Sequence, residues 1–363
     1  MKSITSALIL AASHLLLLSA AQPAGHNAAV PASSDSVVTL HRPNPYQVRI
    51  NGTIRAKYEW QTEMGKGRFQ VRTARVSLRG KVLPSVGYKA EIDLSDKGKI
   101  KMLDAYTDFR PAKGWKFTIG QMRVPFTIDA HRSPHEQYFP NRSFIAKQVG
   151  SVRDVGATVR YDLPSAFPIT LEGGLFNGSG LTGQADFWTE NINFSTKAQF
   201  FFPKGFNLTL SAQKITPGGT RIMMYDAGAY WQRGPIHLEA EYLYKHYHDN
   251  AFSDVNAFNL FGFYNFKLPK GPFHTLSALV RYDYMDDHSN GMRYLSGKPD
   301  PSGSLIINDA ERSRLTAGIT LSFDKNRFKS NIRINYEKYF YTHPEMARLS
   351  ERDKIVVEFM THF

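Results

Sequence analysis

The sequence predicts an all-β chain that closes into a 16-stranded antiparallel transmembrane β-barrel. The first observation is the stretch 47–61, QVRINGTIRAKYEWQ, in which small or apolar residues alternate with polar ones from Val48 onward. This is the period of a strand with two unlike faces, and it runs far beyond the five or six residues of an ordinary strand. The second observation is that the pattern recurs to the last residue, with no stretch of helical period. The third is that every second connection is short.

The composition excludes several classes of protein. The 363 residues are 42% hydrophobic and 13% aromatic, and none is cysteine. A chain without cysteine has no disulfide framework, no thiolate chemistry and no cysteine metal site. Beyond the first residues, no segment approaches the eighteen consecutive apolar residues that a membrane-spanning helix needs.

The first residues have the features of an export signal. Lys2 gives a positive start, an apolar run follows, and Ser19 and Ala21 are small residues at the positions that precede a cleavage site. A membrane anchor is disfavoured because the apolar run is short and is interrupted by His14. We therefore expect a signal peptide over 1–21.

Two further segments complete the predicted domain organisation. Residues 22–47 are small, polar and proline-bearing, so they predict a flexible lead-in with no core to bury. Residues 48–363 carry the alternating pattern and form the barrel domain. The predicted strands are 48–61, 68–82, 86–95, 101–110, 115–123, 153–162, 168–176, 192–202, 205–213, 222–233, 236–248, 256–268, 273–286, 312–323, 330–342 and 353–363.

The connections indicate a barrel of the outer-membrane type. Every second link is a tight turn rich in Pro and Gly, whereas the interleaved links are mostly longer, as at 124–152, 177–191, 287–311 and 343–352. Short turns on one rim and long loops on the other are the layout of such barrels. A secreted soluble β-sandwich or lectin is the alternative, but it predicts shorter strands and no such parity.

A spanning sheet must close on itself, with apolar residues toward lipid and polar residues toward the lumen. Ile50, Ile54 and Ala56 then face lipid. About sixteen strands leave an aqueous channel, and such a channel selects by the charge and width of its lining. The cations on lumen-facing positions are candidates for anion binding: Arg49, Arg55, Lys57, Arg75, Arg79, Lys116 and Arg160. The alternative is that they pair with the equally plentiful lumen-facing acids, such as Glu91 and Asp104, and stiffen the wall.

Several short runs between residues 72 and 156 resemble the phosphate-selective porin O/P family. They are RTARVSLRG at 72–80, YKAEID at 88–93, LDAY at 103–106, IGQMRVPF at 119–126 and RDVG at 153–156. The remaining chain resembles the family mainly in its strand pattern and in its aromatic end, Phe363. A terminal Phe on an apolar face is similar to the signal that the barrel-assembly machinery reads.

The resemblance implies a water-filled porin in the outer membrane of a Gram-negative bacterium, with lipid and small anionic solutes as its partners. It also implies a homotrimer, an anion-attracting lumen suited to phosphate or similar oxyanions, and an inward-folded third loop. It brings no enzyme activity and no cofactor. The cations of the third loop and its entry would then form a basic constriction: Arg123, His131, Arg132, His135, Arg142 and Lys147.

Particular residues suggest other functions. Asp287, His288 and Ser289 superficially resemble the site of outer-membrane phospholipases, but adjacent His and Ser side chains diverge on an extended strand. His246 and His248 share a strand face, as in some metal sites, yet they lack a clear third ligand. The net charge of +13 does not indicate nucleic-acid binding, because export and alternation direct these cations into a lumen. The sequence also leaves open a second interpretation, in which the barrel does not conduct and serves as a receptor or as an accessory of a surface complex.

Overall fold

The structure is a computed structural model that describes residues 48–96, 99–128, 132–149, 152–165, 167–181, 184–325 and 327–363. The predicted signal peptide (1–21), the predicted lead-in (22–47) and His131 lie outside the described residues.

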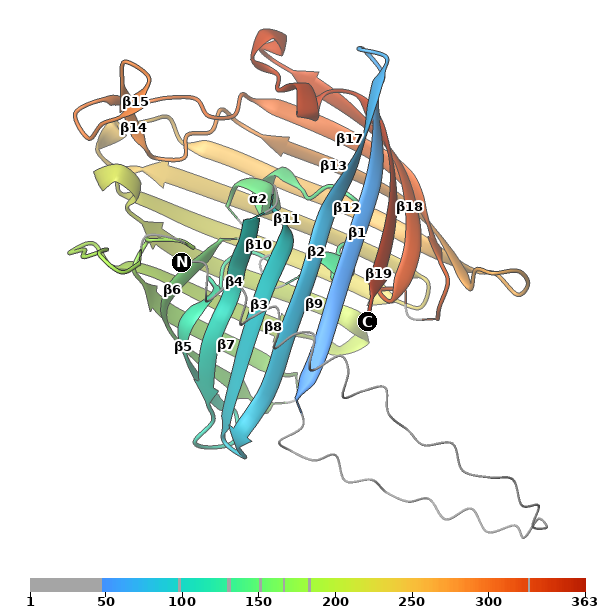
Figure 1. Cartoon of the computed structure of the whole chain (residues 1–363), viewed down its shortest axis with the longest axis horizontal. Coiled ribbons are helices and arrows are strands. Elements are labelled where there is room, and N and C mark those ends of the chain that lie inside the picture. Colours follow the sequence, from blue (N-terminus) through green and yellow to red (C-terminus); the bar gives the residue numbers. More distant parts are fainter. Residues whose placement is uncertain are drawn as a thin grey trace. The chain divides into compact units, whose positions relative to one another are not determined.

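The fold is a closed antiparallel barrel of sixteen strands (Figure 1), as the alternating pattern predicted. Each strand pairs with its sequence neighbours, and the first strand pairs with the last to close the sheet. The barrel strands are β1 (Arg49–Gln61), β2 (Lys66–Leu83), β3 (Val86–Asp96), β4 (Lys99–Phe109), β5 (Trp115–Arg123), β6 (Arg153–Leu163), β7 (Ile169–Phe176), β8 (Asn193–Phe201), β9 (Phe206–Ile215), β10 (Ile222–Arg233), β11 (Ile236–Tyr247), β12 (Val255–Lys267), β13 (Thr275–Met285), β17 (Arg312–Ser322), β18 (Ser330–Tyr341) and β19 (Lys354–His362).

The link between β13 and β17 contains a small sheet of its own. It is built from β14 (Arg293–Leu295), β15 (Lys298–Pro299) and β16 (Ser304–Leu305). The sequence pattern predicted only a long loop here, because strands of two or three residues are too short to show alternation. This loop lies on the rim that also carries the other long links, which we call the long-loop rim; the opposite end is the short-turn rim.

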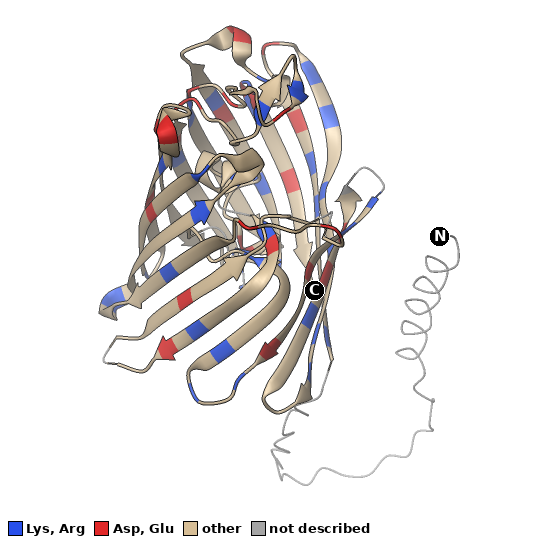
Figure 2. Ribbon diagram, turned by 90° about the vertical axis from the view of Figure 1, so that its left-hand side faces the viewer, with Lys and Arg blue, Asp and Glu red and all other residues tan. Residues whose placement is uncertain are grey.

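Burial alternates along the strands as lipid-facing and lumen-facing positions require. In β1, Ile54 is 50% exposed whereas the next residue, Arg55, is 2% exposed. Lys and Arg, together with Asp and Glu, are distributed over the height of the barrel (Figure 2). An apolar outer face with charged residues turned inward is the inverse of a soluble protein, and it is what a barrel in lipid requires.

This facing predicts opposite outcomes for one substitution at adjacent residues of β2. Val76 is 38% exposed on the outer face, whereas Ser77 lines an interior cavity. We expect Val76→Arg to destabilise the barrel by about 2–4 kcal/mol because it places a cation in lipid. Ser77→Arg should assemble normally, because its guanidinium reaches water. Heat-modifiability gels and urea unfolding in lipid vesicles measure the difference, and equal tolerance of both variants would contradict the assigned faces.

The seam between β1 and β19 explains the glycine in the first strand. The backbone amide of Gly52 donates to the carbonyl oxygen of Phe363 at 2.7 Å, and the amide of Phe363 donates back at 3.0 Å. The Phe363 ring then covers Gly52, where a Cβ atom would come within 2.1 Å of it. Gly52 therefore gives the terminal aromatic ring its place on the outer face.

The long link between β5 and β6 packs inside the barrel. It contains η2 (Pro134–Glu136) and the short helix α2 (Phe144–Gln148). Phe144 and Ile145 of α2 form one apolar cluster with lumen-side residues of other strands, among them Met224 of β10, Leu243 of β11 and Met285 of β13. The lumen near the long-loop rim is thus filled on this side. Within the described residues, no helix is long and apolar enough to cross a membrane.

Candidate pore and constriction

Three buried arginines fix the middle of the β5–β6 link to the barrel wall. Arg55 of β1 donates to the carbonyl oxygen of Pro140 at 2.7 Å, and Arg281 of β13 donates to that of Asn141 at 2.9 Å. Arg314 of β17 donates to the next carbonyl oxygen, that of Arg142, at 2.6 Å. Consecutive backbone carbonyls, which would be orphaned in a buried loop, are therefore satisfied by guanidinium groups from three different strands.

The two ends of this link have further anchors. Arg132 forms an ion pair with Glu239 of β11, at 2.5 Å. Lys147 of α2 forms an ion pair with Glu351 in the β18–β19 link. Tyr138 lies against the rings of Phe261 and Phe263, with centroids 5.3 and 5.0 Å away. Because these partners lie on β11, β12 and the β18–β19 link, the loop packs against one half of the wall and leaves space beside β2–β7.

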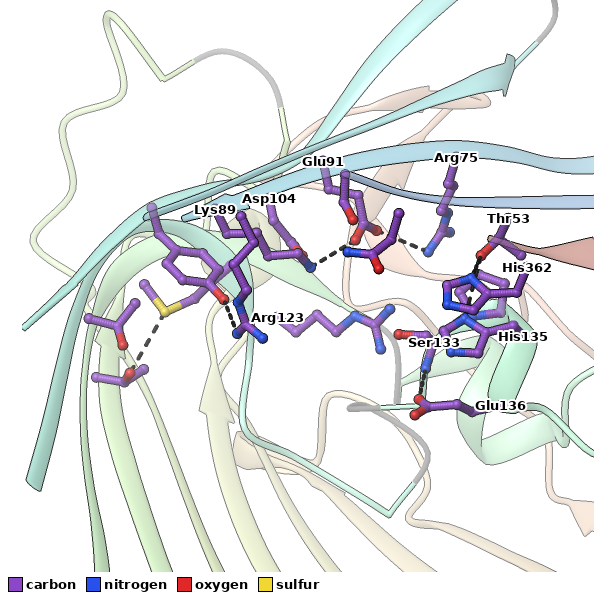
Figure 3. A pocket seen from close by; sticks show the side chains of 18 of the residues that line it. Thr53, Arg75, Lys89, Glu91, Asp104, Arg123, Ser133, His135, Glu136 and His362 are labelled. Atoms are coloured by element: carbon purple, nitrogen blue, oxygen red, sulfur yellow. Dashed lines mark hydrogen bonds and ion pairs between the residues drawn. The ribbon is translucent and has the colours of Figure 1, made fainter. Parts of the chain in front are cut away.

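That space contains an inner cavity of about 450 Å³, bordered by the loop residues Ser133, Pro134, His135 and Glu136 (Figure 3). Its wall residues come mainly from β1 to β7. Six cations and four acids line it. The cations are Arg75, Arg79, Lys89, Lys116, Arg123 and Arg160, and the acids are Glu91, Asp104, Glu136 and Glu172.

Several of these cations stand directly opposite one another on neighbouring strands. Arg79 of β2 is paired in register with Arg49 of β1 on one side and with Lys89 of β3 on the other. Lys116 of β5 is likewise opposite Arg160 of β6. Like charges directly opposite each other destabilise a sheet. Acids compensate two of these cations, Lys89 through Asp104 and Arg160 through Asp162, whereas Arg79 and Lys116 form no ion pair among the described residues.

An outer cavity of about 430 Å³ lies toward the long-loop rim, near the ends of β2, β3 and β4. Its lining holds seven cations and one acid, Asp93. The cations are Arg55, Arg72, Arg75, Lys101, Arg142, Lys147 and Arg153. Arg75 and Pro134 line both cavities, so the two cavities are adjacent at these residues.

A β-bulge brings Arg72 to the outer cavity. Arg55 of β1 is opposite Thr73, and the next residue of β1, Ala56, is opposite Val71, so Arg72 is the extra residue on β2. A bulge re-aims a side chain relative to the regular alternation. Here it puts Arg72 among the cavity-lining residues together with Arg75, three positions away.

Most lining cations are neutralised, and a few are not. Arg75 pairs with Asp93 at 2.9 Å, Lys89 with Asp104 at 2.5 Å, and Arg153 with Asp104 at 2.6 Å. By contrast, neither Arg72 nor Lys116 forms an ion pair or hydrogen bond within the described part of the chain. Among the described residues, the Arg79 side chain forms a hydrogen bond only with the Tyr106 hydroxyl, at 3.5 Å.

The structure distributes the predicted lumen cations between three environments. Arg75, Arg79, Lys116 and Arg160 line the inner cavity, and Arg55 lines the outer one. Lys57 is buried, with Glu59 at 2.6 Å and Asn141 at 2.9 Å, as the ion-pairing alternative predicted for such residues. Arg49 is exposed at the start of β1 and lines neither cavity.

The predicted loop residues are similarly divided. Arg123 and His135 line the inner cavity, while Arg142 and Lys147 line the outer one. Arg132 instead anchors the loop through Glu239. Sequence reasoning missed Arg72, Lys89, Lys101 and Arg153. The alternation of β3 places Lys89 on the lumen side and could have identified it, whereas the bulge that re-aims Arg72 leaves no such mark.

The alternative sites suggested by the sequence form other contacts. The His288 ring faces the Lys245 ammonium at 3.0 Å, and the Ser289 hydroxyl accepts the Gly291 amide at 3.3 Å, so no His–Ser hydrogen bond forms between them. His246 contacts Asp254 at 2.8 Å. Among the described residues, no three His, Asp or Glu side chains are grouped so that they could hold a metal ion.

Comparisons with known proteins agree with this geometry. Residues 48–197 match the family "Phosphate-selective porin O and P", which confirms the resemblance seen in residues 72–156. No curated protein matches the sequence.

Solved structures of outer-membrane channels share the fold. An anion-selective porin from Comamonas acidovorans is 13% identical, with a TM-score of 0.58 over 87% of this chain and 99% of that one. OmpF of Salmonella typhi is 13% identical, with a TM-score of 0.59 over 88% and 98%. The channel DcaP of Acinetobacter baumannii is 14% identical, with a TM-score of 0.54 over 87% and 97%.

Proposed function

We propose that this chain is an outer-membrane porin, a water-filled channel that passes small solutes and prefers anions. The barrel fold and the family match over residues 48–197 support this proposal. Lipid surrounds its apolar outer face, in the outer membrane of a Gram-negative bacterium. The family and the fold point to a channel rather than to an enzyme.

The observation that carries the anion preference is the charge of the residues that line the two adjacent cavities. Seven cations and one acid line the outer cavity, and six cations and four acids line the inner one. Acids outside the outer lining neutralise part of this charge, as Glu358 does for Arg55 and Glu351 for Lys147. A cleft lined by one sign of charge focuses the field and raises the local concentration of counter-ions.

Stepwise passage of an anion is supported by three residues, Arg72, Arg79 and Lys116. Each lines a cavity and has no acidic ion-pair partner among the described residues, so its charge is available to a solute. Arg75, at the junction of the cavities, is partly engaged by Asp93. Several weak sites in series let an ion enter and still leave. Guanidinium forks suit oxyanions such as phosphate, which is the finer selectivity that we propose.

The assembly that we propose follows the sequence expectations. The chain is exported by a signal peptide and inserted by the barrel-assembly machinery, which reads Phe363, and it forms a homotrimer. The position of Phe363 on the outer face at the seam supports its recognition, because the ring is 63% exposed.

Recording from the refolded protein in a planar bilayer under a KCl gradient tests this function. We expect a conducting channel whose reversal potential favours chloride, with chloride current reduced when phosphate is added. A conducting but unselective or cation-preferring channel would overturn the anion preference. A correctly folded barrel with no conductance would overturn the channel and favour the receptor or accessory role.

A further inference from the structure

Two imidazole rings stack at the border of the inner cavity, where the loop meets the end of the barrel. His135 belongs to η2 in the β5–β6 link, and His362 is the last residue of β19 (Figure 3). Their ring centroids are 3.6 Å apart, and their planes differ by 9°. Both Nδ1 atoms face the Thr53 hydroxyl oxygen, at 3.4 Å for His135 and 3.0 Å for His362.

This arrangement suits neutral rings. The Thr53 hydroxyl carries one proton, so it donates to at most one of the two Nδ1 atoms, and the other ring must donate its own N–H to the hydroxyl oxygen. Two neutral rings can therefore share Thr53 and stack. Two imidazolium ions would repel each other across the same distance of 3.6 Å.

The charged groups around the pair offer little compensation for added protons. From β18, Arg333 donates to the His135 carbonyl oxygen at 3.4 Å. Glu358 of β19 is already bound by Arg55 and Arg333, at 2.8 and 3.0 Å.

From the loop itself, Glu136 accepts the Ser133 amide at 2.8 Å. From β2 and β5, Arg75 and Arg123 line the same cavity. Burial, reinforced by His362, Arg333 and Arg123, lowers the pKa of His135 to about 3.

We propose that His135 and His362 form an acid-sensitive latch that holds the loop segment 133–136 against the end of β19 and thereby sets the anion conductance. Protonation adds positive charge to the inner cavity and separates the rings, so acid raises both conductance and anion preference. This inference rests on the proposed channel function and assigns it a pair of histidines, one of which is a strand-end residue outside the predicted constriction.

Linkage gives the direction of the pH effect. A released His135 would titrate near the ordinary value of about 6.5, whereas the latched ring titrates at about 3. The released form binds the proton more tightly, so latching is at full strength above about pH 6.5. It weakens by about tenfold for each pH unit below that, until the latched ring itself protonates.

Single-channel recording at about pH 7.5 and about pH 5.5 tests the latch, since this range lies above the ordinary titration of carboxylates. We expect conductance and chloride preference to rise at the lower pH in the natural sequence. His362→Phe keeps a ring for stacking but replaces one imidazole, and His135→Gln with His362→Gln replaces both. The ratio of conductance at the two pH values should fall toward one in the double variant, and only part of the way in His362→Phe, which keeps the His135 ring.

A ratio that is the same in the natural sequence and in both variants would overturn the latch. Should the double variant fail to fold, as judged by heat-modifiability gels, the ratio for His362→Phe decides alone. A failure of the channel function looks different, because chloride preference would then be missing at pH 7.5 in the natural sequence.

Discussion

Arg79→Glu combined with Lys116→Glu should reverse the ion preference of the channel from anions to cations. Both residues line the inner cavity and form no ion pair among the described residues, so reversing them turns six lining cations and four acids into four cations and six acids. A reversed charge about 7 Å from a permeating ion changes its energy by about 1 kcal/mol in a water-like dielectric. Two reversals therefore change the local anion concentration by tens of fold at low salt. We expect the reversal potential under a KCl gradient to change sign.

A matched control makes the same change in net charge at two positions outside the pore. Lys270 and Lys298 are exposed in connections at opposite rims, and neither lines the two cavities. Lys270→Glu with Lys298→Glu should leave the reversal potential close to its natural value. If both double variants behave alike, the selectivity does not arise from Arg79 and Lys116. High salt should reduce the difference, because exposed charges are screened within about 10 Å at 0.1 M.

Arg314→Met should loosen the constriction loop and destabilise the barrel. The Arg314 guanidinium bonds Asp283 at 2.9 Å and the carbonyl oxygen of Arg142 at 2.6 Å, and Asp283 in turn accepts the amide of Phe144 at 3.1 Å. Asp283 is 0% exposed. Removing one partner of a buried ion pair costs about 3–5 kcal/mol when the remaining charge is left uncompensated. Arg281, which stays 3.2 Å from Asp283, should offset part of this cost.

The expected result is a lower unfolding temperature in heat-modifiability gels together with larger and more variable single-channel conductance. Arg352→Met is the matched control, since Arg352 forms an exposed ion pair with Glu63 at 2.9 Å. Exposed pairs contribute about 0–1 kcal/mol, so this variant should unfold and conduct like the natural protein. An Arg314→Met channel with natural stability and conductance would show that the loop is held by its apolar contacts alone.

Those apolar contacts could have been foreseen in part. Along β10 to β13, lumen-facing positions are polar for most of each strand but become apolar near the long-loop rim, as at Met224, Leu243 and Met285. Apolar residues on a water-facing side indicate that something covers them. The sequence pattern therefore indicates where on the inner wall a segment packs, but not that this segment is α2.

The sequence by itself determined the closed barrel, the facing of its strands and the rim of the long loops. The alternation has a period of two, and each residue's parity fixes whether it meets lipid or lumen. Only the tertiary structure decided which lumen cations remain available to a solute. Lys57 and Lys116 both lie on lumen positions, yet Lys57 is buried by Glu59 and the loop residue Asn141, while Lys116 faces the inner cavity. The physical reason is that ion pairing and desolvation depend on partners from strands and loops far apart in the chain, and a local period carries no information about them.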